Sequence, residues 1–95
     1  IVIDAEVDRI YLDTITDCVI EDKTLKCNIV INKCGSRTTV VWNPWQETAA
    51  KMGDLGENGY KRMLCVESCN AADDVIDIPS GKAHHLWVQN SVKHR

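Results

Sequence analysis

The stretch Thr38-Thr39-Val40-Val41-Trp42-Asn43-Pro44-Trp45 decides the fold of this chain. Its first five residues form a continuous run of β-branched and apolar side chains, which is typical of a central strand. Pro44 ends the run, because proline has no N–H to donate to a neighbouring strand. We therefore predict a central strand over residues 38–42 and look for its partners on either side.

Other segments have the alternating or apolar pattern of short strands. We predict strands over residues 7–12, 17–21, 25–32, 63–68, 75–78 and 86–92. The helical segment is short, covers residues 46–52, and is stopped by Gly53 or Gly56. Neither a repeat nor a linker divides residues 1–95. The predicted fold is a single all-β unit, an antiparallel sandwich with one short helix.

Composition excludes several classes of partner. The formal net charge is -3, which gives no reason to expect nucleic acid or an anionic membrane surface. The chain contains no apolar run of the roughly 18 residues that a membrane-spanning helix needs. It also begins without the basic region of a signal peptide, so we expect a cytoplasmic protein.

The five cysteines are odd in number and lie in strand-like segments, which does not match a disulfide framework. We interpret them as small buried hydrophobic residues of a reduced cytosolic protein. No Cys-x-x-Cys pair is present, so a metal site is not predicted. The three histidines are interpreted as surface residues: His84, His85 and His94.

One carboxylate and two tryptophans suggest a function. Glu67 ends the apolar segment 63–68, where an unpaired charge is costly to desolvate unless it is hydrogen-bonded or used in chemistry. Trp42 and Trp45 end the central strand, and a flat apolar ring can pack on the C–H face of a pyranose. The combination indicates a sugar-binding cleft.

Four linked blocks of the sequence follow one another along the chain: Glu6-Val7-Asp8-Arg9-Ile10-Tyr11, Val40-Val41-Trp42-Asn43-Pro44-Trp45, Ala50-Lys51-Met52-Gly53-Asp54 and Gly59-Tyr60-Lys61-Arg62-Met63-Leu64-Cys65-Val66-Glu67. In order and spacing these blocks resemble the hexose-6-phosphate mutarotases, the glucose-6-phosphate 1-epimerases of the galactose mutarotase-like superfamily, which include apospory-associated protein C. The resemblance covers nearly all of the chain, which looks like the C-terminal third of these proteins.

The resemblance implies part of a β-supersandwich that interconverts the α and β anomers of a hexose 6-phosphate without a cofactor. Glu67 falls on the family's catalytic base, and Asp8 falls on a substrate-binding aspartate. Arg9 is a candidate ligand of the phosphate, since a guanidinium suits that group well. Trp42 is a candidate wall of the sugar site. The general acid of the family is a histidine in the part that this chain lacks.

Each of these residues also has a structural interpretation. Glu67 could be an ordinary exposed carboxylate at a strand end, and Asp8 could form a salt bridge to a neighbouring cation. Arg9 could be purely structural, and Trp42 could serve core packing alone.

The missing acid limits what these 95 residues can do by themselves. We predict that they are inactive in isolation and work with the N-terminal portion of the same protein. The rival interpretation is a non-catalytic carbohydrate-binding or interaction module.

Overall fold

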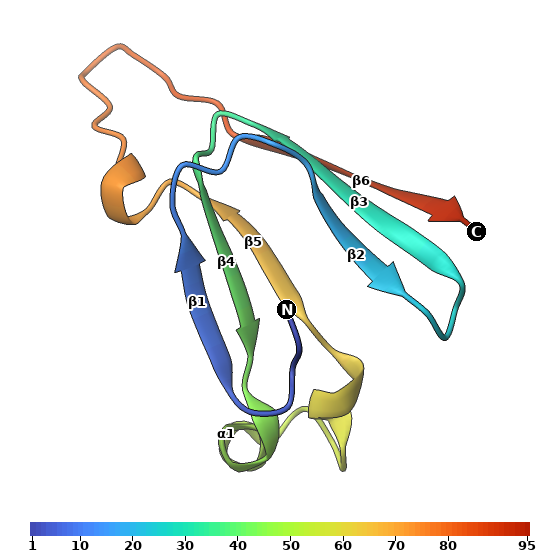
Figure 1. Cartoon of the computed structure of the whole chain (residues 1–95). Coiled ribbons are helices and arrows are strands. Elements are labelled where there is room, and N and C mark those ends of the chain that lie inside the picture. The colour runs from blue at the N-terminus through green and yellow to red at the C-terminus, as the bar shows by residue number, and fades with distance from the viewer.

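The computed structural model describes residues 1–95 and contains two three-stranded antiparallel sheets (Figure 1). The first sheet has the order β1-β4-β5 and the second the order β2-β3-β6. The elements are β1 (Val7–Tyr11), β2 (Cys18–Asp22), β3 (Cys27–Cys34), β4 (Thr38–Asn43), α1 (Trp45–Met52), the 3-10 turn η1 (Gly59–Arg62), β5 (Cys65–Cys69), the 3-10 turn η2 (Ala72–Asp74) and β6 (Trp87–His94). The predicted all-β antiparallel fold with one short helix is confirmed.

Strand β4 is the centre of the first sheet, as its run of β-branched residues predicts, and it pairs with β1 on one side and β5 on the other. Asn43 ends the strand and is almost fully buried. Its side-chain amide donates to the backbone oxygens of Tyr60 and Met63, at 2.9 Å each, and its oxygen accepts the backbone N–H of Trp45 at 2.8 Å. Asn43 therefore fastens the end of β4 to the segment that leads into β5.

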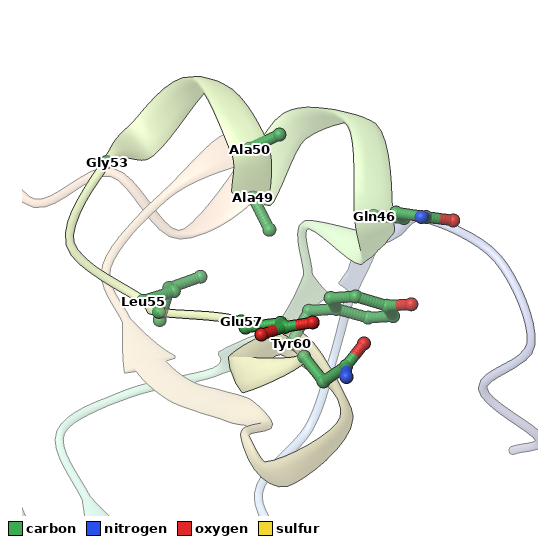
Figure 2. A pocket seen from close by; sticks show the side chains of 9 residues that line it. Gln46, Ala49, Ala50, Gly53, Leu55, Glu57 and Tyr60 are labelled. Atoms are coloured by element: carbon green, nitrogen blue, oxygen red, sulfur yellow. The ribbon is translucent and has the colours of Figure 1, made fainter.

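Helix α1 follows at once and ends at Gly53, whose φ of 76° is the left-handed conformation that favours glycine. The helix packs over η1, where the rings of Trp45 and Tyr60 meet edge to face with centroids 4.9 Å apart. Ala49 and Ala50 line a cavity of about 390 Å³ between the helix and the loop that contains Leu55 (Figure 2). No helix of the structure is long and apolar enough to span a membrane.

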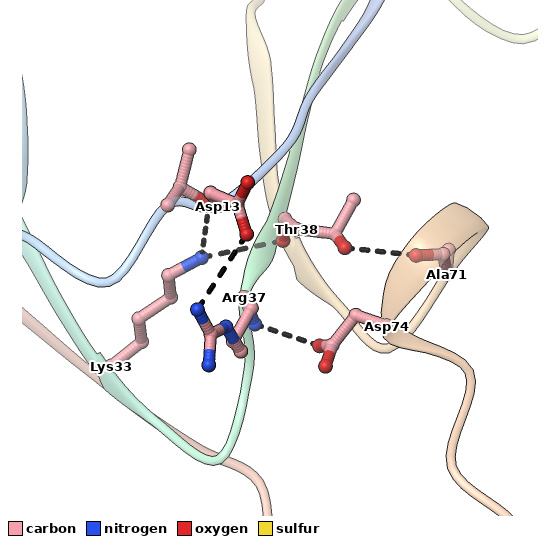
Figure 3. A network of polar contacts seen from close by, with 7 residues as sticks. Asp13, Lys33, Arg37, Thr38, Ala71 and Asp74 are labelled. Atoms are coloured by element: carbon pink, nitrogen blue, oxygen red, sulfur yellow. Dashed lines mark hydrogen bonds and ion pairs between the residues drawn. The ribbon is translucent and has the colours of Figure 1, made fainter.

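The two sheets meet where β3 turns into β4, and a buried ammonium group joins them there (Figure 3). Lys33 of β3 donates to the hydroxyls of Thr14 (2.8 Å), Thr39 (3.0 Å) and Ser36 (3.3 Å) and to the backbone oxygen of Thr38 (3.3 Å). No carboxylate lies within ion-pair distance of this group. The buried charge of this second-sheet residue is therefore satisfied by neutral oxygens of β4 and of the two connecting segments that hold Thr14 and Ser36.

Away from this junction the sheets diverge (Figure 1) and enclose a mainly apolar cavity of about 670 Å³. Tyr11, Val41 and Val66 line it from the first sheet, and Val19 and Ile20 line it from β2. Only 13 of the 95 residues are buried, and many large apolar side chains remain exposed. The sandwich predicted from the sequence is thus an open one in this chain.

One predicted strand is wrong. Residues 75–78 form no strand but continue irregularly from η2, with Val75 and Ile78 exposed. Their apolar character suggested a strand, yet Asp77 interrupts the run and Pro79 follows it directly, and no neighbouring strand offers a partner. The cysteines are all free, but only Cys27 is buried and Cys34 is exposed, so the interpretation of all five as core residues is also wrong.

Asp74 ties the start of β4 to η2. Its Oδ2 accepts the backbone N–H of Arg37 at 2.7 Å and the side-chain amide of Asn70 at 2.8 Å. These hydrogen bonds hold the pKa of Asp74 below its usual value, and the bond from the backbone N–H of Arg37 has the largest effect. The positive charges of Arg37 and His84 lower the pKa further. The carboxylate is favoured in the folded chain over the carboxylic acid.

We expect this preference to appear as acid sensitivity of the fold. Because the folded-state pKa is the lower one, the stabilisation is complete above the unfolded value of 3.8 and is lost as the pH falls through the folded value. The urea midpoint should decline as the pH is lowered from neutral to values below the pKa of a free aspartate. Asp74→Asn should make this decline less steep. Asp77→Asn, a nearby exposed control, should leave the decline unchanged. An equally steep decline in both variants would contradict the assignment.

Candidate functional site

The strand register brings three of the predicted site residues onto one face of the first sheet. Asp8 of β1 is directly opposite Trp42 of β4. Glu67 of β5 is directly opposite Val40, which stands two residues before Trp42 on the same strand. Directly paired residues share a face, and so do residues two apart along a strand. Asp8, Trp42 and Glu67 therefore lie on one face, which we call the carboxylate face.

The spacing within the carboxylate face suits a small ligand. With strands about 4.8 Å apart and a rise of about 3.3 Å per residue, the Cα atoms of Asp8 and Glu67 are about 12 Å apart. Trp42 stands on the strand between them, about 8 Å from Glu67 along the diagonal. Since both carboxylates are exposed and Trp42 is half-buried, the face presents two charged ends with an aromatic floor.

Arg9 lies on the opposite face. It pairs with Val41, and Val41 in turn pairs with Val66, so the three form one row on the side that lines the cavity between the sheets. The structure therefore does not bring Arg9 together with Asp8, Trp42 and Glu67.

The histidines also lie elsewhere. Nε2 of His84 donates to the backbone oxygen of Gly35, 2.9 Å away, in the turn that joins the two sheets. His85 is its exposed neighbour, and His94 lies in β6 of the second sheet. The carboxylate face thus offers carboxylates as proton acceptors but receives no imidazole from the strands of its own sheet.

Two thiols flank Glu67 on the carboxylate face. Cys65 and Cys69 stand two residues before and after it on β5, and both are half-buried. Burial raises the pKa of both thiols, and the negative charge of Glu67 raises them further, while Lys33 acts in the opposite direction on Cys69. The thiols are therefore neutral at physiological pH, and Glu67 is the charged group on this strand.

The interpretation from the sequence overlooked Cys65. It belongs to the same cross-strand row as Asp8 and Trp42, because Trp42 pairs with both Asp8 and Cys65. The two-residue spacing from Glu67 was a usable signal, since it alone places Cys65 on the face of the candidate base.

The candidate site is an open surface in this chain. Cavities lie between the sheets, beneath α1, beside the Gly35 turn and near Arg95, and none of these four contains Asp8, Trp42 or Glu67. Enclosure of a ligand on the carboxylate face would therefore need additional polypeptide above the sheet.

Comparisons with known proteins agree with the resemblance seen in the sequence. A curated protein of Cenchrus ciliaris named "Putative glucose-6-phosphate 1-epimerase" is 45% identical over 82 residues, which are 86% of this chain and 25% of that protein. Proteins of the same name from Escherichia coli K12 and Salmonella typhimurium LT2 are 35% and 38% identical over 70% and 67% of the chain, and 22% of each relative is covered. No solved structure matches.

The matched residues span about a quarter of the length of these relatives. The family model for aldose 1-epimerase matches residues 1–90, which include the whole first sheet, β2, β3 and the first half of β6. The chain therefore belongs to the aldose 1-epimerase family.

Proposed function

We propose that this chain carries the catalytic base and part of the sugar site of an enzyme that interconverts the α and β anomers of a hexose 6-phosphate. The observation that supports this most strongly is the convergence of Asp8, Trp42 and Glu67, from three different strands, on one face of one sheet. The relatives named glucose-6-phosphate 1-epimerase point to the substrate class.

The proposed chemistry needs two proton movements. Glu67, as a carboxylate, takes the proton of the anomeric hydroxyl while an acid protonates the ring oxygen. The C1–O5 bond breaks to give the open-chain aldehyde, the C1–C2 bond rotates, and the ring closes on the other face of the carbonyl. No metal or cofactor is required, because only protons and one C–O bond change.

The other residues of the carboxylate face would position the sugar. The ring of Trp42 offers an apolar surface for the C–H face of the pyranose. Asp8 can accept hydrogen bonds from hydroxyl groups at the opposite end of the ring from Glu67. Arg9 faces away from this site, so we assign the binding of the phosphate to cations outside the first sheet.

The acid and the phosphate ligands must then come from further polypeptide. The relatives are about four times as long as the matched part of this chain, and the sheets here remain open and partly uncovered. We propose that residues 1–95 work as the C-terminal part of such a longer protein, that they are inactive in isolation, and that the enzyme acts in the cytoplasm, where its thiols stay reduced.

Exchange spectroscopy by NMR tests this proposal, because it measures the interconversion of the anomers of glucose 6-phosphate at equilibrium. We expect acceleration by the full-length polypeptide and none by residues 1–95. The rival function, a carbohydrate-binding module, predicts instead that glucose 6-phosphate shifts the amide resonances of the full-length polypeptide without changing the exchange rate. That second result would overturn the enzymatic proposal.

A further inference from the structure

Cys65 occupies a position on the carboxylate face for which the proposed mechanism has no use. It pairs with Trp42 across the sheet, and it stands two residues before Glu67 on the same face of β5. Neighbouring strands place the Cα atoms of Cys65 and Trp42 about 5 Å apart, and those of Cys65 and Glu67 are about 6.6 Å apart along the strand. Cys65 is therefore the residue that adjoins both the aromatic floor and the candidate base.

A sugar over Trp42 with its anomeric hydroxyl at Glu67 must lie beside this thiol. Cys65, Trp42 and Glu67 stand at the corners of a triangle on the carboxylate face. The side chain of Cys65 is half-buried, so part of it remains accessible to a ligand. We propose, on the basis of the function proposed above, that Cys65 is a further substrate-contacting residue, and that bulk added to its sulfur closes the sugar site.

The protonation state of the thiol fits this role. Burial and the charge of Glu67 raise the pKa of Cys65, so the group stays an S–H. The proposed reaction passes through an aldehyde, and a thiolate, unlike a thiol, is a strong nucleophile toward such a carbon. A neutral thiol beside the aldehyde can contact the substrate without forming a thiohemiacetal that would trap it.

The chain provides two matched controls. Cys69 lies on the same strand and the same face as Cys65, but on the other side of Glu67, where it pairs with Thr38 instead of Trp42. Cys34 is exposed and lies in β3 of the second sheet. Bulk on Cys65 should therefore block the site, whereas the same bulk on Cys69 or Cys34 should leave it open.

The test uses full-length variants that retain only one of these three cysteines, with serine at every other cysteine position. Methyl methanethiosulfonate is the probe: the thiolate attacks its sulfenyl sulfur, an S–S bond forms, methanesulfinate leaves, and the thiol proton passes to solvent. We expect methylthiolation of Cys65 to slow anomer exchange more than tenfold, with recovery after dithiothreitol. Modified Cys69 and Cys34 variants should keep at least half of their rate.

Two further measurements separate contact from fold stability. Saturating glucose 6-phosphate should slow the labelling of Cys65, followed by intact mass, without slowing that of Cys34. Cys65→Met should raise KM, whereas Cys65→Ser should keep the KM of the wild type. The urea midpoint should be unchanged in both variants. Unimpaired exchange by fully methylthiolated Cys65 would overturn the inference alone, whereas absence of exchange in the unmodified protein would overturn the proposed function and the inference with it.

Discussion

Glu67→Gln is expected to reduce the rate of anomer exchange by the full-length polypeptide by about 100- to 10,000-fold, the range usual for loss of a general base. Glutamine keeps the shape of the side chain but cannot accept the proton of the anomeric hydroxyl. Because Glu67 is exposed, the substitution should not disturb the packing of β5. The rate is read by NMR exchange spectroscopy after subtraction of the spontaneous reaction.

Glu21→Gln is the matched control for this prediction. Glu21 is another exposed glutamate within a strand, but it lies in β2 of the second sheet and its partner is Arg95 at 3.9 Å. We expect its rate to stay within twofold of the wild type. A Glu67→Gln enzyme with the wild-type rate would exclude Glu67 as the base.

Glu67→Gln should also alter the reactivity of the two neighbouring thiols, Cys65 and Cys69. Removing the charge of Glu67 removes one cause of the raised pKa of Cys65 and Cys69, although the larger cause, burial, remains. Both should react faster with a thiol reagent at a given pH in the variant, and Cys34 should not. Unchanged reactivity would mean that the carboxylate lies farther from the thiols than the register places it.

Gly35→Ala is expected to be the most destabilising small substitution in the chain. Gly35 has a φ of 79°, and a Cβ there would overlap the backbone oxygen of His85. The irregular segment 82–86 would have to move away. This would break the contact of His84 with the oxygen of Gly35 and disturb the pair of Cys34 with Trp87, where β6 begins. We expect a loss of about 3 kcal/mol or more in the free energy of unfolding.

Gly53→Ala separates the clash from the backbone strain. Gly53 has nearly the same φ, 76°, but a Cβ at that position meets nothing within 4 Å. Gly53→Ala should lower the free energy of unfolding only by the cost of an alanine in the left-handed conformation, about 1 to 2 kcal/mol. Urea unfolding followed by tryptophan fluorescence measures both variants, and equal losses would show that residues 82–86 yield without cost.

Local chemistry of the sequence explains which parts of the fold were predictable. The β-branched run before Pro44 specified β4, and Gly53 specified the end of α1. Residues 75–78 have similar apolar character but form no strand, since a strand also needs a partner, and pairing depends on residues far away in the sequence.

The candidate site shows the same division. The alternation of side chains within a strand already separates Asp8 from Arg9 and joins Cys65 to Glu67. Whether Asp8 and Glu67 share a face depends on the offsets of two strand pairs, β1 with β4 and β4 with β5. A shift of either pair by one residue would place the two carboxylates on opposite faces, so only the register could bring them together.

The central position of β4 has a kinetic consequence. The β2–β3 hairpin separates β1 from β4 in the sequence, and α1 and η1 separate β4 from β5. Each of the two pairings of β4 therefore closes a long loop before its contacts form. Non-local strand pairing of this kind folds slowly. Asp8 and Glu67 come to lie on either side of Trp42 only after both β1 and β5 have paired with β4. The ability to bind a sugar should therefore appear in the last phase of refolding, well after the local β2–β3 hairpin has formed.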